Sequence, residues 1–147
     1  MCCRGMRRQV TRERIANSDG GCAIEIKSYR DLKVWQEAMS VAERTYRLTS
    51  CFPKDEVYGM TSQIRRAAVS IAANIAEGHG RENSGSFIQF LRISQGSLKE
   101  LETHLLLAAR VGLVTTEEIE TVLRQCDELG RTLRGLIRSI QSRQSND

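Results

Sequence analysis

The chain has 147 residues, 40% of them hydrophobic and 27% charged, and a formal net charge of +4 at pH 7. This length suits one domain with its own hydrophobic core, and a single proline is typical of long helices rather than of β-sandwiches. No apolar run approaches the roughly 18 residues of a membrane span, and the N-terminus lacks the apolar segment of a secretory signal. We therefore expect a cytoplasmic protein without a membrane partner.

The first 27 residues differ in charge from the rest of the chain. Residues 1–27 carry six Lys or Arg against three Asp or Glu, whereas residues 28–147 carry sixteen against fifteen. We predict a disordered basic leader over 1–27 and a four-helix domain over 28–143. A translation start downstream of the leader is an alternative. The five cysteines, without a signal peptide, indicate reduced thiols in a cytoplasm rather than disulfides.

The first helix is expected to start at Ser28. Apolar residues follow one another at steps of three and four in this stretch, which places them on one helix face. They are Leu32, Trp35, Met39, Ala42 and Tyr46. The residue before a proline avoids the α region, and proline itself suits the start of a helix, so the chain is expected to break at Pro53.

The second helix is expected to end at Gly78. Its apolar face consists of Val57, Met60, Ile64, Ala67, Ile71 and Ile75. Glycine readily adopts the left-handed conformation that follows the last turn of many helices, and we assign Gly78 to that position. In the connection over residues 81–86, Ser84 or Ser86 is expected to cap the third helix.

The third and fourth helices show the same spacing. The third is expected to end at Gly112, with a face of Phe87, Phe90, Ser94, Leu98, Leu101, Leu105 and Ala108. Thr115 and Glu118 form a capping-box signature, with Thr116 as the alternative cap. The fourth helix has a face of Ile119, Val122, Cys126, Leu129, Leu133, Leu136 and Ile140. These patterns predict an all-α fold, an antiparallel up-down-up-down four-helix bundle.

Two segments are more apolar than a single bundle requires. Residues 67–76 of the second helix and residues 104–114 of the third are apolar nearly all round. A helix of this kind is usually covered on all sides, and a homo-oligomer is the simplest way to cover it. The alternative is an alanine-rich helix that exposes methyl groups without consequence.

The polar residues of the second helix form one narrow line. They are Gln63, Arg66, Ser70, Asn74 and Glu77, with Arg81 just beyond the end of the line. Such a line can contact a partner, line the axis of a ring, or form hydrogen bonds to a neighbouring helix. We therefore treat it as a candidate functional or inter-subunit surface.

Arginines cluster on the second and fourth helices. Arg124, Arg131 and Arg138 lie seven residues apart, and no acidic residue occurs between Glu128 and Asp147. The candidates for nucleic-acid binding are Arg65, Arg66, Arg81, Arg124, Arg131, Arg134 and Arg138. The alternative is a solvated face with two ion pairs at a spacing of four residues, Glu120–Arg124 and Asp127–Arg131.

The glycine-rich stretch Gly78-His79-Gly80 carries no recognisable binding chemistry. It follows a helix rather than a strand, and neither a dinucleotide fingerprint nor a P-loop is present. Neither histidine has a metal-ligand partner at helical spacing, and the pair Glu100–His104 has no counterpart on other helices. We therefore predict no metal, no cofactor, no catalytic residue and no enzymatic activity.

Three stretches resemble a known family. They are "YRDLKVWQEA", "FPKDEVYGMTSQIRRAAVSIAANIAEGHGR" and "FIQFLRISQGSLKELETHLLLAARVG". These stretches look like the four-helix-bundle proteins first noticed inside intervening sequences of bacterial 23S ribosomal RNA genes. The resemblance covers roughly Ser28 to Ile140, and "NIAEGHGR" and "GSLKELETHL" are its most specific parts.

The resemblance implies an assembly and a class of function. Members are similar in forming small up-down bundles that assemble as rings of five. The family also looks related to the accessory variability protein of diversity-generating retroelements, a pentamer that binds nucleic acid and the reverse transcriptase. The resemblance therefore implies a homopentamer that binds RNA or another nucleic acid without catalysis. A protein-interaction scaffold without nucleic-acid binding is the alternative.

Overall fold

The computed structural model describes residues 26–146. Four α-helices form the fold: α1 (Lys33–Thr49), α2 (Met60–Gly80), α3 (Ser84–Arg110) and α4 (Thr116–Gln144). Two short 3-10 turns precede α1 and α2, η1 (Tyr29–Asp31) and η2 (Lys54–Glu56). The described residues contain no strand, so the prediction of an all-α fold with four helices is confirmed. The predicted leader lies outside the described residues, apart from its last two residues.

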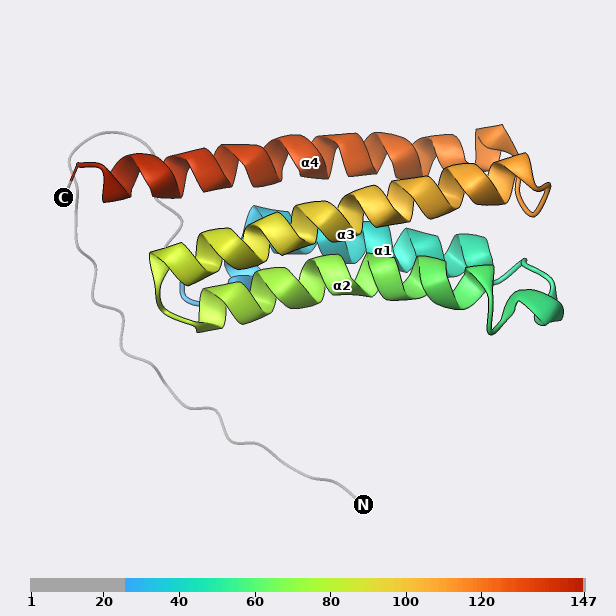
Figure 1. Ribbon diagram of the computed structural model, residues 1–147, viewed down its shortest axis with the longest axis horizontal. Helices are drawn as coiled ribbons and strands as arrows, with labels where there is room; N and C mark the ends of the chain where they lie inside the picture. Colours follow the sequence, from blue (N-terminus) through green and yellow to red (C-terminus); the bar gives the residue numbers. More distant parts are fainter. Residues whose placement is uncertain (1–25, 147) are drawn as a thin grey trace, which may run out of the picture.

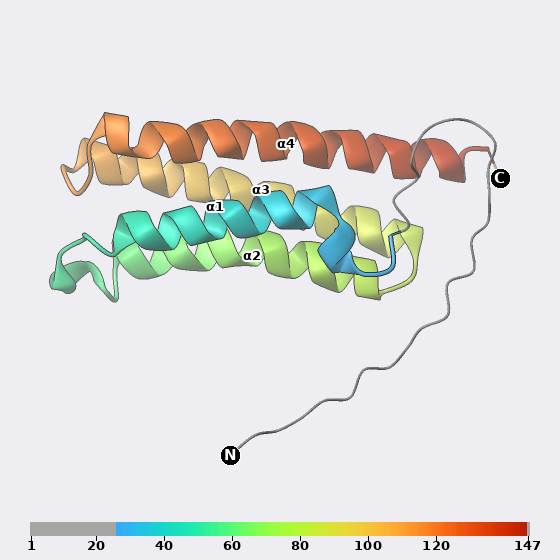
Figure 2. The same cartoon turned by 180° about the vertical axis from the view of Figure 1, so that it is seen from behind.

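Each helix contacts two others. α1 packs against α2, α2 against α3, α3 against α4, and α4 against α1, whereas within residues 26–146 the diagonal pairs have no Cα atoms within 8 Å of each other. Figures 1 and 2 show the helices side by side, with their connections at alternating ends. The starts of α1 and α3 and the ends of α2 and α4 therefore gather at one end of the bundle. None of the helices in this part of the chain combines the length and hydrophobicity that a membrane crossing requires.

The core lies along the bundle axis and follows the predicted helix faces most closely in α4. The buried residues of α4 include Ile119, Val122, Cys126, Leu129 and Leu133. Towards its end, Ile137 is buried instead, and the predicted Leu136 and Ile140 are only half-buried. A straight helix drifts by about 20° per seven residues against a strict heptad, so the heptad pattern loses the core face in its third repeat.

The predicted face of α1 is wrong at Met39 and Tyr46, whereas Leu32 and Ala42 are buried and Trp35 packs against the core. Met39 and Tyr46 are each 45% exposed, and the buried residues of the helix are Val34, Ala38, Val41, Ala42, Thr45 and Thr49. Val34, Ala38 and Val41 form a second apolar stripe beside the predicted one, and this second stripe faces the core. The α1 residues of the predicted stripe instead line a groove beside α2.

The second helix begins at Met60, later than its predicted apolar face implied. Pro53 precedes η2 rather than an α-helix, and Val57 is 48% exposed after that turn. Met60 is half-buried, and the other predicted positions are buried, which confirms the face from Ile64 onward; they are Ile64, Ala67, Ile71 and Ile75.

Gly78 does not have the predicted left-handed conformation. The helix continues to Gly80, and Gly78 is buried against α3, where an added Cβ would lie 2.5 Å from Cβ of Phe90. The positive φ of this connection falls on Glu82 (53°). Gly78 is therefore required for the close approach of α2 and α3. The cap of α3 is Asn83, whose Oδ1 accepts the Ser86 N–H at 3.0 Å, rather than either predicted serine.

Two predicted helix ends are confirmed. Gly112 has φ 82° after α3, and the Leu113 N–H donates to the Ala108 carbonyl at 3.0 Å, which is the Schellman arrangement. The Thr115 hydroxyl accepts the Glu118 N–H at 3.2 Å, and the Thr115 N–H donates to the Glu118 carboxylate at 2.8 Å. This capping box starts α4 at the predicted place.

Candidate functional site

The polar line of α2 lies along its boundary with α3. The Ser70 and Ser97 hydroxyls are 2.9 Å apart across the two helices, and Asn74 Nδ2 donates to the Ser70 carbonyl and hydroxyl at 2.8 and 3.0 Å. The Ser94 hydroxyl donates to the Ile71 carbonyl at 3.1 Å. The middle of the line therefore holds two helices together, which is one of the three roles considered for it.

The two ends of this line face solvent. Gln63 and Arg66 are exposed at one end, and Glu77 and Arg81 form an ion pair of 2.7 Å at the other. Ser97 was absent from the predicted site residues, although its place one turn from Ser94 on the buried face of α3 marks it as a partner for a polar group. Because buried polar groups are usually hydrogen-bonded, a serine at a core position of one helix predicts a polar partner on the neighbouring helix.

Two of the candidate arginines are engaged within the chain. Arg65 Nε donates to the Thr49 hydroxyl at 2.8 Å, and its guanidinium lies over the Tyr46 ring at 4.6 Å. The Arg81 guanidinium lies 5.4 Å from the centre of the Phe90 ring and also pairs with Glu77. These contacts fix both side chains against the bundle, so their charges are less available to a ligand than those of free arginines.

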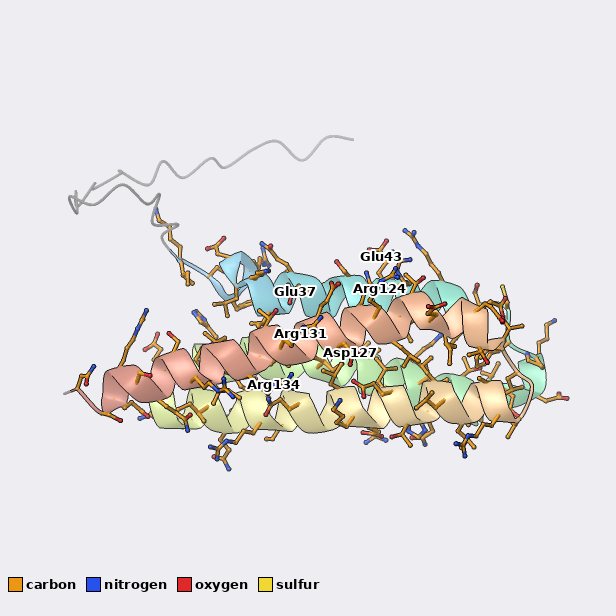
Figure 3. All side chains as sticks on the ribbon, turned by 90° about the horizontal axis from the view of Figure 1, so that it is seen from above. Glu37, Glu43, Arg124, Asp127, Arg131 and Arg134 are labelled. Atoms are coloured by element: carbon orange, nitrogen blue, oxygen red, sulfur yellow. The ribbon has the colours of Figure 1, made fainter. Side chains whose placement is uncertain are left out.

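The arginines of α4 are exposed and unpaired within the described residues. Arg124, Arg131, Arg134 and Arg138 form no ion pair within 4.0 Å there, so the two α4 ion pairs considered above are not formed. Figure 3 shows Arg124 and Arg131 on the side of α4 nearer α1, next to Glu43 and Glu37 of that helix, and Arg134 on the side nearer α3. Guanidinium groups in this state are available for phosphate contacts.

Charge is distributed unequally along the bundle. One half contains the starts of α1 and α3 and the ends of α2 and α4 (Figure 1), and consists of residues 26–41, 70–97 and 130–146. This basic half carries nine Lys or Arg against four Asp or Glu, a net charge of +5. The acidic half, residues 42–69 and 98–129, carries eight against ten, a net charge of −2. The described chain is therefore strongly basic at one end only.

An apolar groove runs between α1 and α2 on the outside of the bundle. It has a volume of about 650 Å³, and its lining residues include Trp35, Met39, Tyr46, Val69, Ala73 and Ala76. The partly buried Trp35 ring packs edge-on against Tyr29, with ring centres 5.3 Å apart, at the η1 end of the groove. We call this surface the α1–α2 groove. Val69, Ala73 and Ala76 belong to residues 67–76, the segment of α2 that the sequence showed to be more apolar than a single bundle requires.

The glycine-rich end of α2 is a packing site. The His79 ring stacks edge-on against Phe87 at 5.8 Å, which places it beside Gly78 at the contact with α3. Within residues 26–146 no group of three or more His, Cys, Asp or Glu side chains is placed to hold a metal ion. The structure thus gives this stretch a role in helix packing.

Burial of the Cys126 thiol in the core makes stability depend on pH. Loss of solvation, assisted by the nearby Glu102 carboxylate, raises the pKa of Cys126 from 9.0 to about 12. Above pH 9 the unfolded chain loses this proton and the folded chain keeps it. We expect the free energy of unfolding to fall by about 1.4 kcal/mol per pH unit above pH 9 from this group alone. The free energies of unfolding of the parent and of Cys126→Ala are measured with urea between about pH 8 and pH 10.5. The two values should approach each other as pH rises, whereas a constant difference would contradict this role of Cys126.

Comparison with known proteins identifies the family. Residues 30–135 match the family model described as 23S rRNA-intervening sequence protein. The chain belongs to this family. The match spans all of α1, α2 and α3 and the greater part of α4, and it ends before Arg138. No curated protein matches the sequence.

A solved structure is similar to this intervening-sequence protein and supports its place in the family. It is a protein of unknown function from the S23 ribosomal protein family of Bacteroides thetaiotaomicron, with a TM-score of 0.63 and 27% sequence identity. The alignment covers 71% of this chain and 97% of that chain. The predicted relation to the accessory variability protein of retroelements stays a prediction.

Proposed function

We propose that this intervening-sequence protein is a non-catalytic, homo-oligomeric RNA-binding protein of the bacterial cytoplasm. Its bundle has the antiparallel up-down-up-down arrangement and presents the basic half to RNA phosphates. The observation that carries the proposal is the net charge of +5 on one half of the bundle, which includes unpaired arginines of α4. Sequence-independent affinity for nucleic acid comes chiefly from such phosphate contacts.

The aromatic residues favour contacts with the RNA backbone over contacts with bases. Single-stranded RNA is usually read by aromatic rings that stack on exposed bases. In the basic half, the rings of Tyr29, Trp35, Phe87 and Phe90 are all partly buried in the bundle. Arginine contacts to phosphates of a structured RNA therefore fit this surface better than sequence-specific reading of bases.

Two separate apolar surfaces support self-assembly. The α1–α2 groove is one, and the exposed side chains of Ile93, Leu107 and Val111 on one face of α3 are the other. When two different patches of one chain fit each other, the contact is head-to-tail and can close into a ring. The family resemblance favours five copies. A ring repeats the basic half in every copy, which multiplies phosphate contacts.

RNA binding is tested by neutralising α4. Arg131, Arg134 and Arg138, all exposed in the basic half, are replaced together by glutamine. We expect at least about tenfold weaker binding to a structured RNA at moderate salt, and a log–log salt slope smaller by about 2 or more, because three phosphate contacts are lost per chain. Filter binding across a salt series, with the oligomer mass measured in the same buffer, gives both quantities.

A matched control removes the same charge elsewhere. Arg44, Arg47 and Arg110 are exposed in the acidic half, and their joint replacement by glutamine should leave the salt slope nearly unchanged. Equal losses in both triple variants would show binding by net charge alone and would contradict a localised interface. No binding of the parent at low salt, with the oligomer intact, would reject the RNA-binding proposal.

The second candidate function is a protein-interaction scaffold. It is favoured by the α1–α2 groove, which is apolar and large enough to accept side chains from another protein. Under this alternative the α4 arginines are dispensable and the groove carries the function. The α4 triple variant therefore separates the two candidates, because only RNA binding requires its three arginines.

A further inference from the structure

A second apolar groove lies between the start of α1 and the last part of α4. Its volume is about 530 Å³, and its lining residues include Ile26, Leu32, Val34, Thr132, Gly135, Leu136 and Ser139. It lies in the basic half, at the end of the bundle where α1 begins and α4 ends (Figure 2). We call it the α1–α4 groove. Asp31 and Lys33 also line it, but most of its surface is apolar, and a folded chain normally covers such surface.

The chain enters the bundle at this groove. Ile26 forms part of its wall and is 55% exposed, and the backbone N–H groups of Lys27 and Ser28 both donate to Asp31 Oδ2 at 3.0 Å. These two hydrogen bonds fix the backbone immediately after Ile26. The residues that precede Ile26 therefore begin at the groove rather than at a distance from it.

The preceding sequence has the pattern of a segment with one apolar side. Residues 22–26 read Cys-Ala-Ile-Glu-Ile, so Cys22, Ile24 and Ile26 alternate with other residues. In an extended backbone, alternate side chains point to the same side. Because Ile26 lines the groove, Ile24 and Cys22 would lie on the same side of an extended segment and could face the groove as well. Four extended residues span about 13 Å.

The floor of the groove is open at Gly135. A Cβ built on Gly135 meets no atom within 4 Å, although Gly135 lies inside α4 and lines the groove. A glycine inside a helix costs about 1 kcal/mol relative to alanine, and Gly135 packs against no described atom that would require it. The space above it is wide enough to receive a side chain from an adjacent segment.

We propose that residues 22–25 of the chain itself occupy the α1–α4 groove as an extended segment, with Ile24 seated over Gly135. This docking holds the preceding arginines at the basic half; they are Arg4, Arg7, Arg8, Arg12 and Arg14. The leader then adds positive charge beside Arg134 and Arg138 of α4. The docking itself is independent of RNA; only the contribution of the leader to RNA binding rests on the proposed function.

The test uses Cys22 as a reporter in the full chain. Cys2, Cys3 and Cys51 are replaced by serine, which leaves Cys22 and the buried Cys126. The alkylation rate of Cys22 is then measured by mass spectrometry of the tryptic peptide. Gly135→Leu fills the groove. We expect Cys22 to react about tenfold faster in Gly135→Leu than in the parent, because the docked segment shields the thiol.

The control places the same substitution at another open glycine. A Cβ on Gly96, an exposed position in the middle of α3, also meets no atom within 4 Å. Gly96→Leu should leave the slow rate of Cys22 unchanged. If Gly135→Leu fails to fold by circular dichroism, Ile24→Asp replaces it, with the same expected acceleration.

Two results overturn the proposal. Equal Cys22 rates in the parent and in the variant that disrupts the groove would show that the segment is not docked there. Protection that disappears on dilution would assign the groove to the segment of another copy instead. Because the readout contains no RNA, failure of the docking leaves the RNA-binding test of the α4 arginines unaffected.

Discussion

Replacing Gly78 by alanine is expected to destabilise the bundle by about 2 to 3 kcal/mol, the cost of overpacking a tight core contact. A Cβ at this position would lie 2.5 Å from Cβ of Phe90 and 3.1 Å from Cδ2 of Phe87. The first of these atoms is attached directly to the α3 backbone, so it cannot move aside by a rotamer change. The two helices must separate, and the core residues beneath them lose contact.

The measurement is urea unfolding at a fixed protein concentration, compared with Gly96→Ala. Gly96 lies inside α3 with open space around it. Glycine to alanine inside a helix normally stabilises it by about 0.5–1 kcal/mol, so this control should be more stable than the parent. The same substitution is thus expected to have opposite signs at the two sites. A Gly78→Ala variant as stable as the parent would show that α2 and α3 do not depend on this close approach.

If the chain assembles as proposed, replacing Val69 by glutamate is expected to convert the proposed oligomer into folded monomers. Val69 is 45% exposed in the chain and lines the α1–α2 groove. In the proposed assembly it is covered by the next copy, and a buried carboxylate without a partner costs several kcal/mol at each contact. Sedimentation or light scattering gives the mass, and circular dichroism shows whether the bundle remains folded.

Val57→Glu is the matched control for this experiment. Val57 is 48% exposed, close to the value for Val69, but it follows η2 in the loop before α2 and does not line the groove. Its replacement should leave the mass unchanged. Dissociation by both variants, or by neither, would show that the α1–α2 groove is not the contact between copies.

Much of the fold follows from local rules in the sequence. The α4 register up to Leu133 and the capping box at Thr115 depend only on the spacing of residues near one another. The face of α1 could not be predicted in this way, because both sides of that helix carry apolar residues. Helical spacing alone does not say which side meets the core. Gly78 was misassigned for a similar reason, since its role depends on Phe90 of the next helix.

The candidate site depends even more on the three-dimensional arrangement. The residues of the basic half come from three separate stretches of sequence. The net charge of the whole chain does not reveal them, because the negative charge of the acidic half offsets part of their positive charge. Only the path of the helices brings the start of α1 beside the end of α4. The hydrogen bond between Ser70 and Ser97 likewise joins residues 27 positions apart, which no helical spacing relates.

The unequal charge of the two halves gives each chain a permanent electric dipole along the bundle axis. A dipole of this kind turns the molecule in the field of a polyanion before contact, so encounters occur mainly with the basic half foremost, and this preference weakens as salt screens the field. In a ring, the components of these dipoles parallel to the rotation axis add, whereas the perpendicular components cancel. In a two-fold dimer of oppositely directed bundles the dipoles cancel completely. The direction of the bundles relative to the symmetry axis therefore decides whether the orienting field survives.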